Sequence, residues 1–171
     1  MSLADNNADL NRLLDAAADK IGKVRYCWLL TAAGEGGIRA RPMGRVPRDA
    51  DEEEWTLRFL TDGLSPKVAD LRRVGTVSVI FQHDPDDAFV ALTGTASLAE
   101  GKPEIRRRWK PAYDTYFPDG PDRSSAIFVT IDVARVELWI RGVTPEPFGL
   151  QATTLERDGA GAWRLTGGNG A

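Results

Sequence analysis

The first regular pattern in the chain is an apolar stripe near the N-terminus. Leu10, Leu13, Leu14, Ala17 and Ile21 recur at steps of three and four residues. This spacing puts them on one face of a helix, so the pattern predicts an amphipathic helix over 7–23, with Gly22 at its end.

After residue 23 the pattern becomes that of strands. It predicts strands over 24–33, 38–46, 55–61, 76–81, 89–98 and 126–140, with a glycine-rich turn at 34–37. Gly94 lies inside one of these runs and predicts a β-bulge. Two short helices are expected, one opened by Ser65 and Pro66 and one over 103–109.

The C-terminal part contains Pro145 and Pro147, which predict a linker, and then a hairpin over 151–166. Most connections are too short for repeated parallel crossovers, so the sheet should be largely antiparallel. We therefore expect a mainly β protein with flanking helices: a single domain over 1–171 with a small barrel over 24–141.

Composition limits the chemistry that the side chains can perform. The 171 residues include 22 Lys and Arg against 25 Asp and Glu, so no strong overall field attracts polyanions. The single histidine, His83, and single cysteine, Cys27, exclude disulfides within the chain and zinc sites with several Cys or His ligands. Any redox chemistry is therefore expected to come from a bound cofactor.

The N-terminal residues 1–5 are polar and acidic, unlike the basic and then apolar start of a signal peptide. No apolar run approaches the roughly 20 residues of a membrane helix. Together with the lone cysteine, this favours a cytoplasmic protein without a membrane contact.

The segment 59–67 has the sequence F-L-T-D-G-L-S-P-K, in which a strand, a turn and a helix start follow one another. A helix N-terminus offers free backbone N–H groups that bind phosphate, and Ser65 and Lys67 add a hydroxyl and a positive charge. The other interpretation is an ordinary capped helix with a solvated lysine.

Arg39 and Arg41 lie two residues apart on the predicted strand 38–46, so their side chains share a face. Two arginines on one face can bind a phosphate or a carboxylate, although both could also face solvent. Because this strand is expected beside 55–61, Arg41 could reach the same phosphate as Lys67.

An ordered series of motifs over about residues 10–140 resembles the pyridoxamine 5′-phosphate oxidase-like family, and most closely its general stress protein branch. The series is R-x-R-P-M, F-L-T-D-x-x-S-x-K, V-S-V-I-F-Q, L-T-G-T-A and W-K-P-x-Y followed by Y-F-P-D-G-P-D. The resemblance implies an FMN-binding, antiparallel Greek-key split β-barrel that forms a homodimer with flavin at the subunit interface.

The resemblance also implies which residues contact FMN. The phosphate would be held by Arg41, Ser65 and Lys67. The backbone along the ring and ribityl chain would be that of Pro42, Met43, Leu60 and Thr61. Gln82, Trp139 and the partner subunit's Trp109 would lie near the site.

Two departures from the family pattern concern the substrate. The stretch 138–147 contains no R-x-H-D-R cluster of the kind that holds the substrate phosphate in true oxidases, and Phe89 stands where those enzymes have a glutamine. We therefore expect an FMN-dependent oxidoreductase with an unidentified substrate, with NAD(P)H as a possible electron donor, rather than a pyridoxamine phosphate oxidase. No catalytic side chain is identified. The alternatives are a flavin-storage protein, or a split barrel that uses a deazaflavin or haem.

Other features favour structural interpretations. The basic run 106–110 is more typical of a solvated helix face than of a nucleic-acid site, and His83 with its neighbouring aspartates more typical of a solvated loop than of a metal site. Cys27 lies in an apolar strand and is expected to be a buried, inert thiol. No metal and no nucleic acid are expected.

Overall fold

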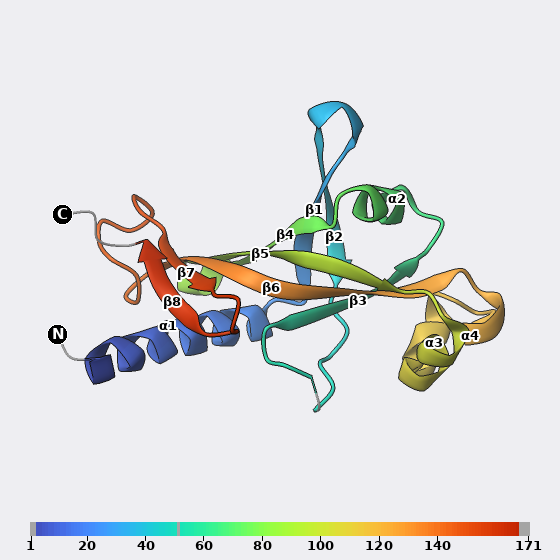
Figure 1. Ribbon diagram of the computed structural model, residues 1–171, viewed down its shortest axis with the longest axis horizontal. Helices are drawn as coiled ribbons and strands as arrows, with labels where there is room; N and C mark the ends of the chain where they lie inside the picture. Colours follow the sequence, from blue (N-terminus) through green and yellow to red (C-terminus); the bar gives the residue numbers. More distant parts are fainter. Residues whose placement is uncertain (1–2, 51, 168–171) are drawn as a thin grey trace.

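The computed structural model describes residues 3–50 and 52–167 (Figure 1). Its helices are α1 (Leu3–Lys23), α2 (Pro66–Arg73), α3 (Lys102–Arg108) and α4 (Gly120–Arg123). Its strands are β1 (Tyr26–Ala32), β2 (Ile38–Gly44), β3 (Thr56–Asp62), β4 (Thr76–His83), β5 (Ala88–Ala99), β6 (Ala126–Ile140), β7 (Thr153–Arg157) and β8 (Trp163–Gly167).

The strands form one antiparallel sheet in the order β2-β1-β4-β5-β6-β7-β8, and β3 pairs with β6 as well. The place of β3 beside β6, outside the order of the sequence, gives the predicted Greek-key connectivity. The segments 38–46 and 55–61 are expected side by side, but they do not pair along their length. The two segments meet only at the isolated bridge between Val46 and Arg58, so the barrel is split between β2 and β3.

The predicted bulge at Gly94 is confirmed. Thr93 pairs with Arg135 but Gly94 pairs with Val133, so β6 contains one extra residue, Ala134, at this point. A Cβ atom on Gly94 would lie 2.2 Å from the backbone oxygen of Asp132. Glycine is therefore required here for β5 and β6 to approach each other.

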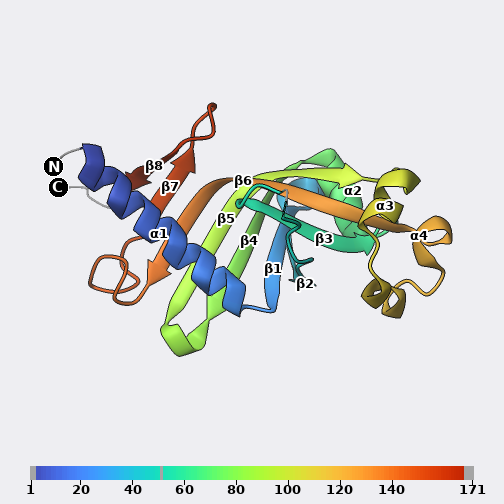
Figure 2. The ribbon, with the colours of Figure 1, turned by 90° about the horizontal axis from the view of Figure 1, so that it is seen from below.

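Helix α1 lies across the sheet and covers one end of the core (Figure 2). Leu13, Ala17 and Ile21 are buried, as the stripe predicted. The helix begins at Leu3 rather than at residue 7, because Leu3 and Ala4 are good helix formers and extend the first turn. Among the residues that the structure describes, no helix is both long and apolar enough to cross a membrane.

The C-terminal hairpin continues the sheet where β3 stops. β3 pairs with β6 as far as Asp132, and β7 pairs with β6 from Arg135 to Leu138. The rings of Trp55 and Trp163 meet edge to face, with their centroids 5.3 Å apart. One cluster of buried side chains runs from Leu13 in α1 to Leu155 in β7, so the helix, barrel and hairpin share a core.

Candidate functional site

The turn between β3 and α2 presents polar groups toward β2. The carboxylate of Asp62 accepts hydrogen bonds from the backbone N–H of Leu64 (2.9 Å) and the hydroxyl of Ser125 (2.6 Å), which fixes the turn. Ser65 is the N-cap of α2 and Pro66 follows it, as predicted. The Ser65 side chain makes no capping hydrogen bond to the helix, so its hydroxyl remains available to other groups.

Lys67 extends back over this turn. Its Nζ donates to the hydroxyl of Thr61 at 2.8 Å and to that of Ser65 at 3.2 Å. Among the described residues, no carboxylate lies within ion-pair distance of Lys67. Thr61, Ser65 and Lys67 therefore form one cluster of hydrogen-bonded side chains at the start of α2.

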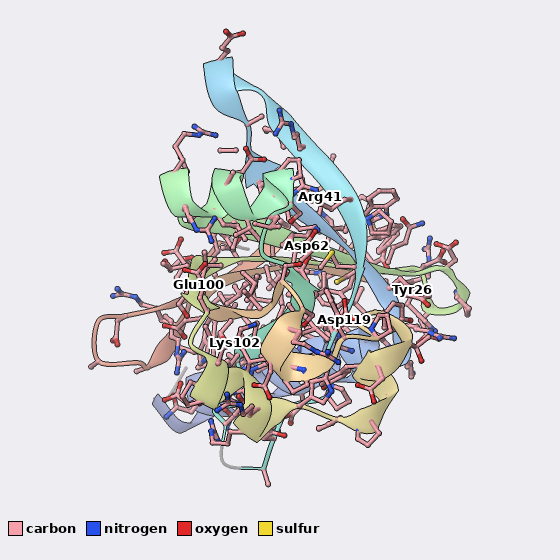
Figure 3. All side chains as sticks on the ribbon, turned by 90° about the vertical axis from the view of Figure 1, so that its right-hand side faces the viewer. Tyr26, Arg41, Asp62, Glu100, Lys102 and Asp119 are labelled. Carbon is pink, nitrogen blue, oxygen red and sulfur yellow. The ribbon has the colours of Figure 1, made fainter. Side chains whose placement is uncertain are left out.

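Arg41 approaches the same region from β2, beside α2 in Figure 3. Arg39 and Arg41 share a face, as predicted, because both approach the buried carboxylate of Asp70, at 3.2 and 3.8 Å. Asp70 also accepts a hydrogen bond from the hydroxyl of Thr31 at 3.1 Å. Nη1 of Arg41 is buried, with no hydrogen-bond partner among the described residues.

The electrostatics of this group favour an anion. Burial lowers the pKa of the Lys67 ammonium, and the positive charge of Arg41 lowers it further. Burial is also the main cause that lowers the pKa of Arg41. Two desolvated cations and an unpaired guanidinium N–H next to a helix N-terminus fit a phosphate group, which would accept the free donors and stabilise both charges.

A cavity of about 440 Å³ adjoins these polar side chains through Thr61, which lines it and contacts Lys67. It is lined by Pro42 and Met43 of β2 and by Leu60 and Thr61 of β3, the four residues that the resemblance assigns to the flavin ring and ribityl chain. The structure thus brings together seven of the ten predicted site residues: Arg41, Pro42, Met43, Leu60, Thr61, Ser65 and Lys67.

Sequence reasoning missed the aromatic side of the cavity. Tyr26, Tyr113, Tyr116 and Phe117 also line it, together with Arg25, Gly44, Arg45, Val46 and Asp62. The sequence shows that 113–117 is rich in aromatic residues. Their spacing does not show that they face β2 and β3. The ring of Tyr113 is held in place by Phe128, at a centroid distance of 6.1 Å.

Comparison with known proteins agrees with this geometry. The family model described as pyridoxamine 5′-phosphate oxidase like matches residues 14–150. The chain belongs to the pyridoxamine 5′-phosphate oxidase-like family. A comparison with curated proteins found no significant match.

Solved structures show the fold of this family member. A Clostridium acetobutylicum protein related to general stress protein 26 is 16% identical, with a TM-score of 0.69 over 85% of this chain and 94% of that one. A pyridoxamine 5′-phosphate oxidase-related, FMN-binding protein of Nostoc punctiforme is 16% identical, with a TM-score of 0.70 over 92% and 95%. General stress protein 26 of Bacillus anthracis is 18% identical, with a TM-score of 0.60 over 74% and 93%.

Three predicted site residues of this family member lie elsewhere in the protomer. Gln82 is exposed at the end of β4 and donates to Asp84. Trp139 lies on the outer face of β6, across from Phe89 of β5. Trp109 packs against Tyr113, behind the aromatic side of the cavity, with ring centroids 5.7 Å apart. Since β1 separates β2 from β4, one chain alone does not bring Gln82 and Trp139 to Arg41.

The basic run of α3 is engaged in ion pairs. Arg106 contacts Asp122, Arg107 contacts Glu104, and Arg108 contacts Glu104, Asp49 and Glu52. Lys110 lies 3.6 Å from Asp49. Each of these four cations therefore has an acidic partner within the same protomer.

The single histidine lies beside a carboxylate, and the single cysteine lies in the core. Nδ1 of His83 lies 3.2 Å from the carboxylate of Asp86, which Lys20 and Lys23 also contact. Cys27 is buried, as predicted, and burial raises the pKa of its thiol to about 11, which disfavours the reactive thiolate. Among the described residues, no group of His, Cys, Asp and Glu could hold a metal ion.

Proposed function

We propose that this protein binds FMN, with the phosphate on Arg41, Ser65 and Lys67 and the ring system in the adjoining cavity. The observation that supports this most strongly is the buried, unpaired Nη1 of Arg41 beside the desolvated ammonium of Lys67. The cavity of about 440 Å³ next to them lies within the usual size range of small-molecule sites.

We further propose that the protein is an FMN-dependent oxidoreductase. Bound flavin would supply the electron or hydride transfer. The chain would then need no redox-active side chains of its own, in keeping with its one histidine and one cysteine. The chain itself binds the phosphate, orients the ring between β2, β3 and the aromatic residues, and excludes water from the ring face. Pyridoxamine phosphate is not its expected substrate, since 138–147 lacks the arginine and histidine cluster.

A second copy of the chain would complete the flavin site. Gln82 and Trp139 lie on the outer face of the sheet, and the same face exposes the large apolar side chain of Trp28, 49% accessible. A homodimer across this face would cover Trp28 and bring Gln82 and Trp139 to the flavin of the other protomer. Light scattering should give the mass of two chains, and a monomer at micromolar concentration would contradict this.

The test of the proposed function is the absorption spectrum of the purified protein. We expect a yellow protein with flavin bands, or a colourless one that quenches FMN fluorescence on titration. Reduction of the bound flavin by NADH or NADPH, followed by reoxidation with an acceptor, would support the oxidoreductase. Bound flavin that no donor reduces would support flavin storage, and a haem or deazaflavin spectrum would overturn FMN.

The affinity for FMN should depend on pH through Lys67. Because burial and Arg41 lower the pKa of Lys67, its charge is lost at a lower pH than that of a free lysine. The phosphate dianion favours the charged ammonium, so FMN binding should weaken as the pH rises through this lowered pKa. It should also weaken below roughly pH 6, where the phosphate dianion takes up a proton and becomes a monoanion.

Riboflavin is the control for this pH dependence, because it has the same ring and no phosphate. The dissociation constant of riboflavin, measured by flavin fluorescence, should not rise at high pH, where loss of the Lys67 charge weakens FMN binding. An FMN profile identical to that of riboflavin, or one unchanged by Lys67→Ala, would contradict this prediction.

A further inference from the structure

A buried carboxylate, that of Asp70, lies beside the cations proposed to hold the phosphate. Asp70 is on α2, three residues after Lys67, and its side chain is only 7% exposed. A carboxylate at this depth costs free energy unless cations and hydrogen-bond donors surround it. It also repels a phosphate, so its presence beside Arg41 works against phosphate binding unless it organises the site.

Three elements bring donors and cations to this carboxylate. The hydroxyl of Thr31, on β1, donates to Oδ2 of Asp70 at 3.1 Å. Nη1 of Arg39, on β2, donates to both carboxylate oxygens, at 3.2 and 3.3 Å. Nη2 of Arg73, one turn further along α2, lies 3.7 Å from Oδ1. Asp70 thereby ties α2 to β1 and to the part of β2 that carries Arg41.

The two arginines of β2 meet Asp70 in different ways. Arg39 makes both hydrogen bonds and is 53% exposed. Nη2 of Arg41 lies 3.8 Å from Oδ2 of Asp70, which is an ion-pair distance but too long for a hydrogen bond. Nη1 of Arg41 is buried and has no partner in the part of the chain that the structure describes. The carboxylate therefore attracts Arg41 without occupying its Nη1.

The charge balance around Arg41 depends on Asp70. Burial lowers the pKa of Arg41, the Asp70 carboxylate opposes this by raising it, and the positive charge of Arg39 lowers it further. Without the carboxylate, Arg39, Arg41 and Arg73 would repel one another. Arg41, whose side chain is 18% exposed, would then turn toward solvent and away from Lys67.

We propose that Asp70 is a positioning residue that gives Arg39 and Arg41 different roles. It keeps Arg39 as its own counterion and orients Arg41, with Nη1 free, toward the phosphate; the identity of that ligand rests on the proposed function. Charge alone would give the opposite effect on loss of Asp70, because removing a negative charge strengthens phosphate binding. The two explanations therefore differ in the sign of a measurable change.

The experiment measures the dissociation constants of FMN and riboflavin for Asp70→Asn by flavin fluorescence. Asparagine keeps the shape and can still accept a hydrogen bond from Thr31, but it lacks the charge that holds the arginines. We expect FMN to bind at least about fivefold more weakly and riboflavin to stay within about twofold of wild type. Asp132→Asn is the matched control and should change neither, since it alters the net charge equally at an exposed carboxylate that pairs with Arg157.

A double-mutant cycle tests whether Asp70 acts through Arg41. In an Arg41→Ala background, Asp70→Asn should no longer weaken FMN binding, because the side chain that it positions is absent. A role confined to folding would weaken the binding of both flavins, and that of FMN in both backgrounds. An effect of charge alone would strengthen FMN binding in both backgrounds. Either of these results would overturn the proposal.

Arg39→Ala tests the difference in roles at an exposed side chain, so the test does not depend on how well Asp70→Asn folds. We expect FMN binding to weaken by no more than about threefold, much less than in Arg41→Ala, because Arg39 contacts Asp70 and not the phosphate. Equal losses in Arg39→Ala and Arg41→Ala would show that both arginines hold the phosphate, and the proposal would be wrong.

Inorganic phosphate separates this proposal from that of FMN binding. Its binding to flavin-free protein is measured as the rise in Tm with phosphate concentration, at an ionic strength held constant with chloride. Phosphate should stabilise the wild-type protein more than Asp70→Asn. If it does so while FMN does not bind, the proposed function fails and the role of Asp70 stands. If phosphate stabilises both proteins equally, or neither, the role of Asp70 is wrong whatever the flavins do.

Discussion

Replacing both Arg41 and Lys67 by alanine should nearly abolish FMN binding while riboflavin binding changes little. Each substitution removes a charge-assisted contact to the phosphate, worth about 1.5–3 kcal/mol. Each single variant should therefore weaken the affinity for FMN roughly 10- to 150-fold. Arg41 should have the larger effect of the two, because its Nη1 lacks any partner among the described residues.

Arg72→Ala is the matched control for this experiment. Arg72 lies on the same helix as Lys67, is about half exposed and pairs with Glu100 on the protein surface. Its loss changes the net charge equally but removes no group from the phosphate site, so FMN binding should stay within twofold of wild type. If Arg41→Ala and Lys67→Ala bind FMN as well as Arg72→Ala does, the phosphate lies elsewhere.

Gly94→Ala should be among the most destabilising single substitutions in the barrel. The added methyl group would lie 2.2 Å from the carbonyl oxygen of Asp132 and 3.0 Å from a side-chain carbon of Ile131. The first contact is with the backbone of the paired strand, so β5 and β6 must separate to accommodate it. We expect a loss of about 3 kcal/mol or more in the free energy of unfolding, measured by urea denaturation.

Gly75→Ala is the control, at a glycine that precedes β4. A methyl group there would meet its nearest neighbours at 3.7 and 3.8 Å, which is ordinary van der Waals contact. We expect a change within about 0.5 kcal/mol, or a small gain from the lower entropy of the unfolded chain. Equal urea midpoints of unfolding for Gly94→Ala and Gly75→Ala would show that β5 and β6 do not approach closely at Gly94.

The local elements could be predicted because their signals are local. The spacing of Leu13, Ala17 and Ile21 predicts the buried face of α1, and Ser65-Pro66 predicts the start of α2. The ends of several strands shifted by one or two residues. Hydrogen bonding decides those ends, and hydrogen bonds depend on a partner strand that is distant in sequence.

The pairing of β3 could not be predicted from adjacency. Residues 38–46 and 55–61 look like neighbours because they are close in sequence, yet β3 pairs with β6, some 70 residues further on. Buried side chains of β3, such as Phe59, gain more from the core that β6 completes than from the exposed edge of β2. Only the single bridge between Val46 and Arg58 remains at the split.

By itself, the sequence determined the class of the protein and the residue types suited to a phosphate. One histidine and one cysteine leave few side chains for metal or thiol chemistry, and the order of the motifs indicated the family whose model matches the chain. The R-x-R pattern was enough to put Arg39 and Arg41 on one face, because that depends only on the pleat of a strand.

The tertiary structure decided which of these residues meet. It paired Arg39 with Asp70, left Nη1 of Arg41 unpaired and brought Lys67 to Thr61, distinctions that no spacing shows. It also assembled the aromatic side of the cavity beside Lys67 from segments far apart in the chain. The physical reason is that burial and charge pairing depend on distances in space, whereas a sequence specifies only distances along the chain.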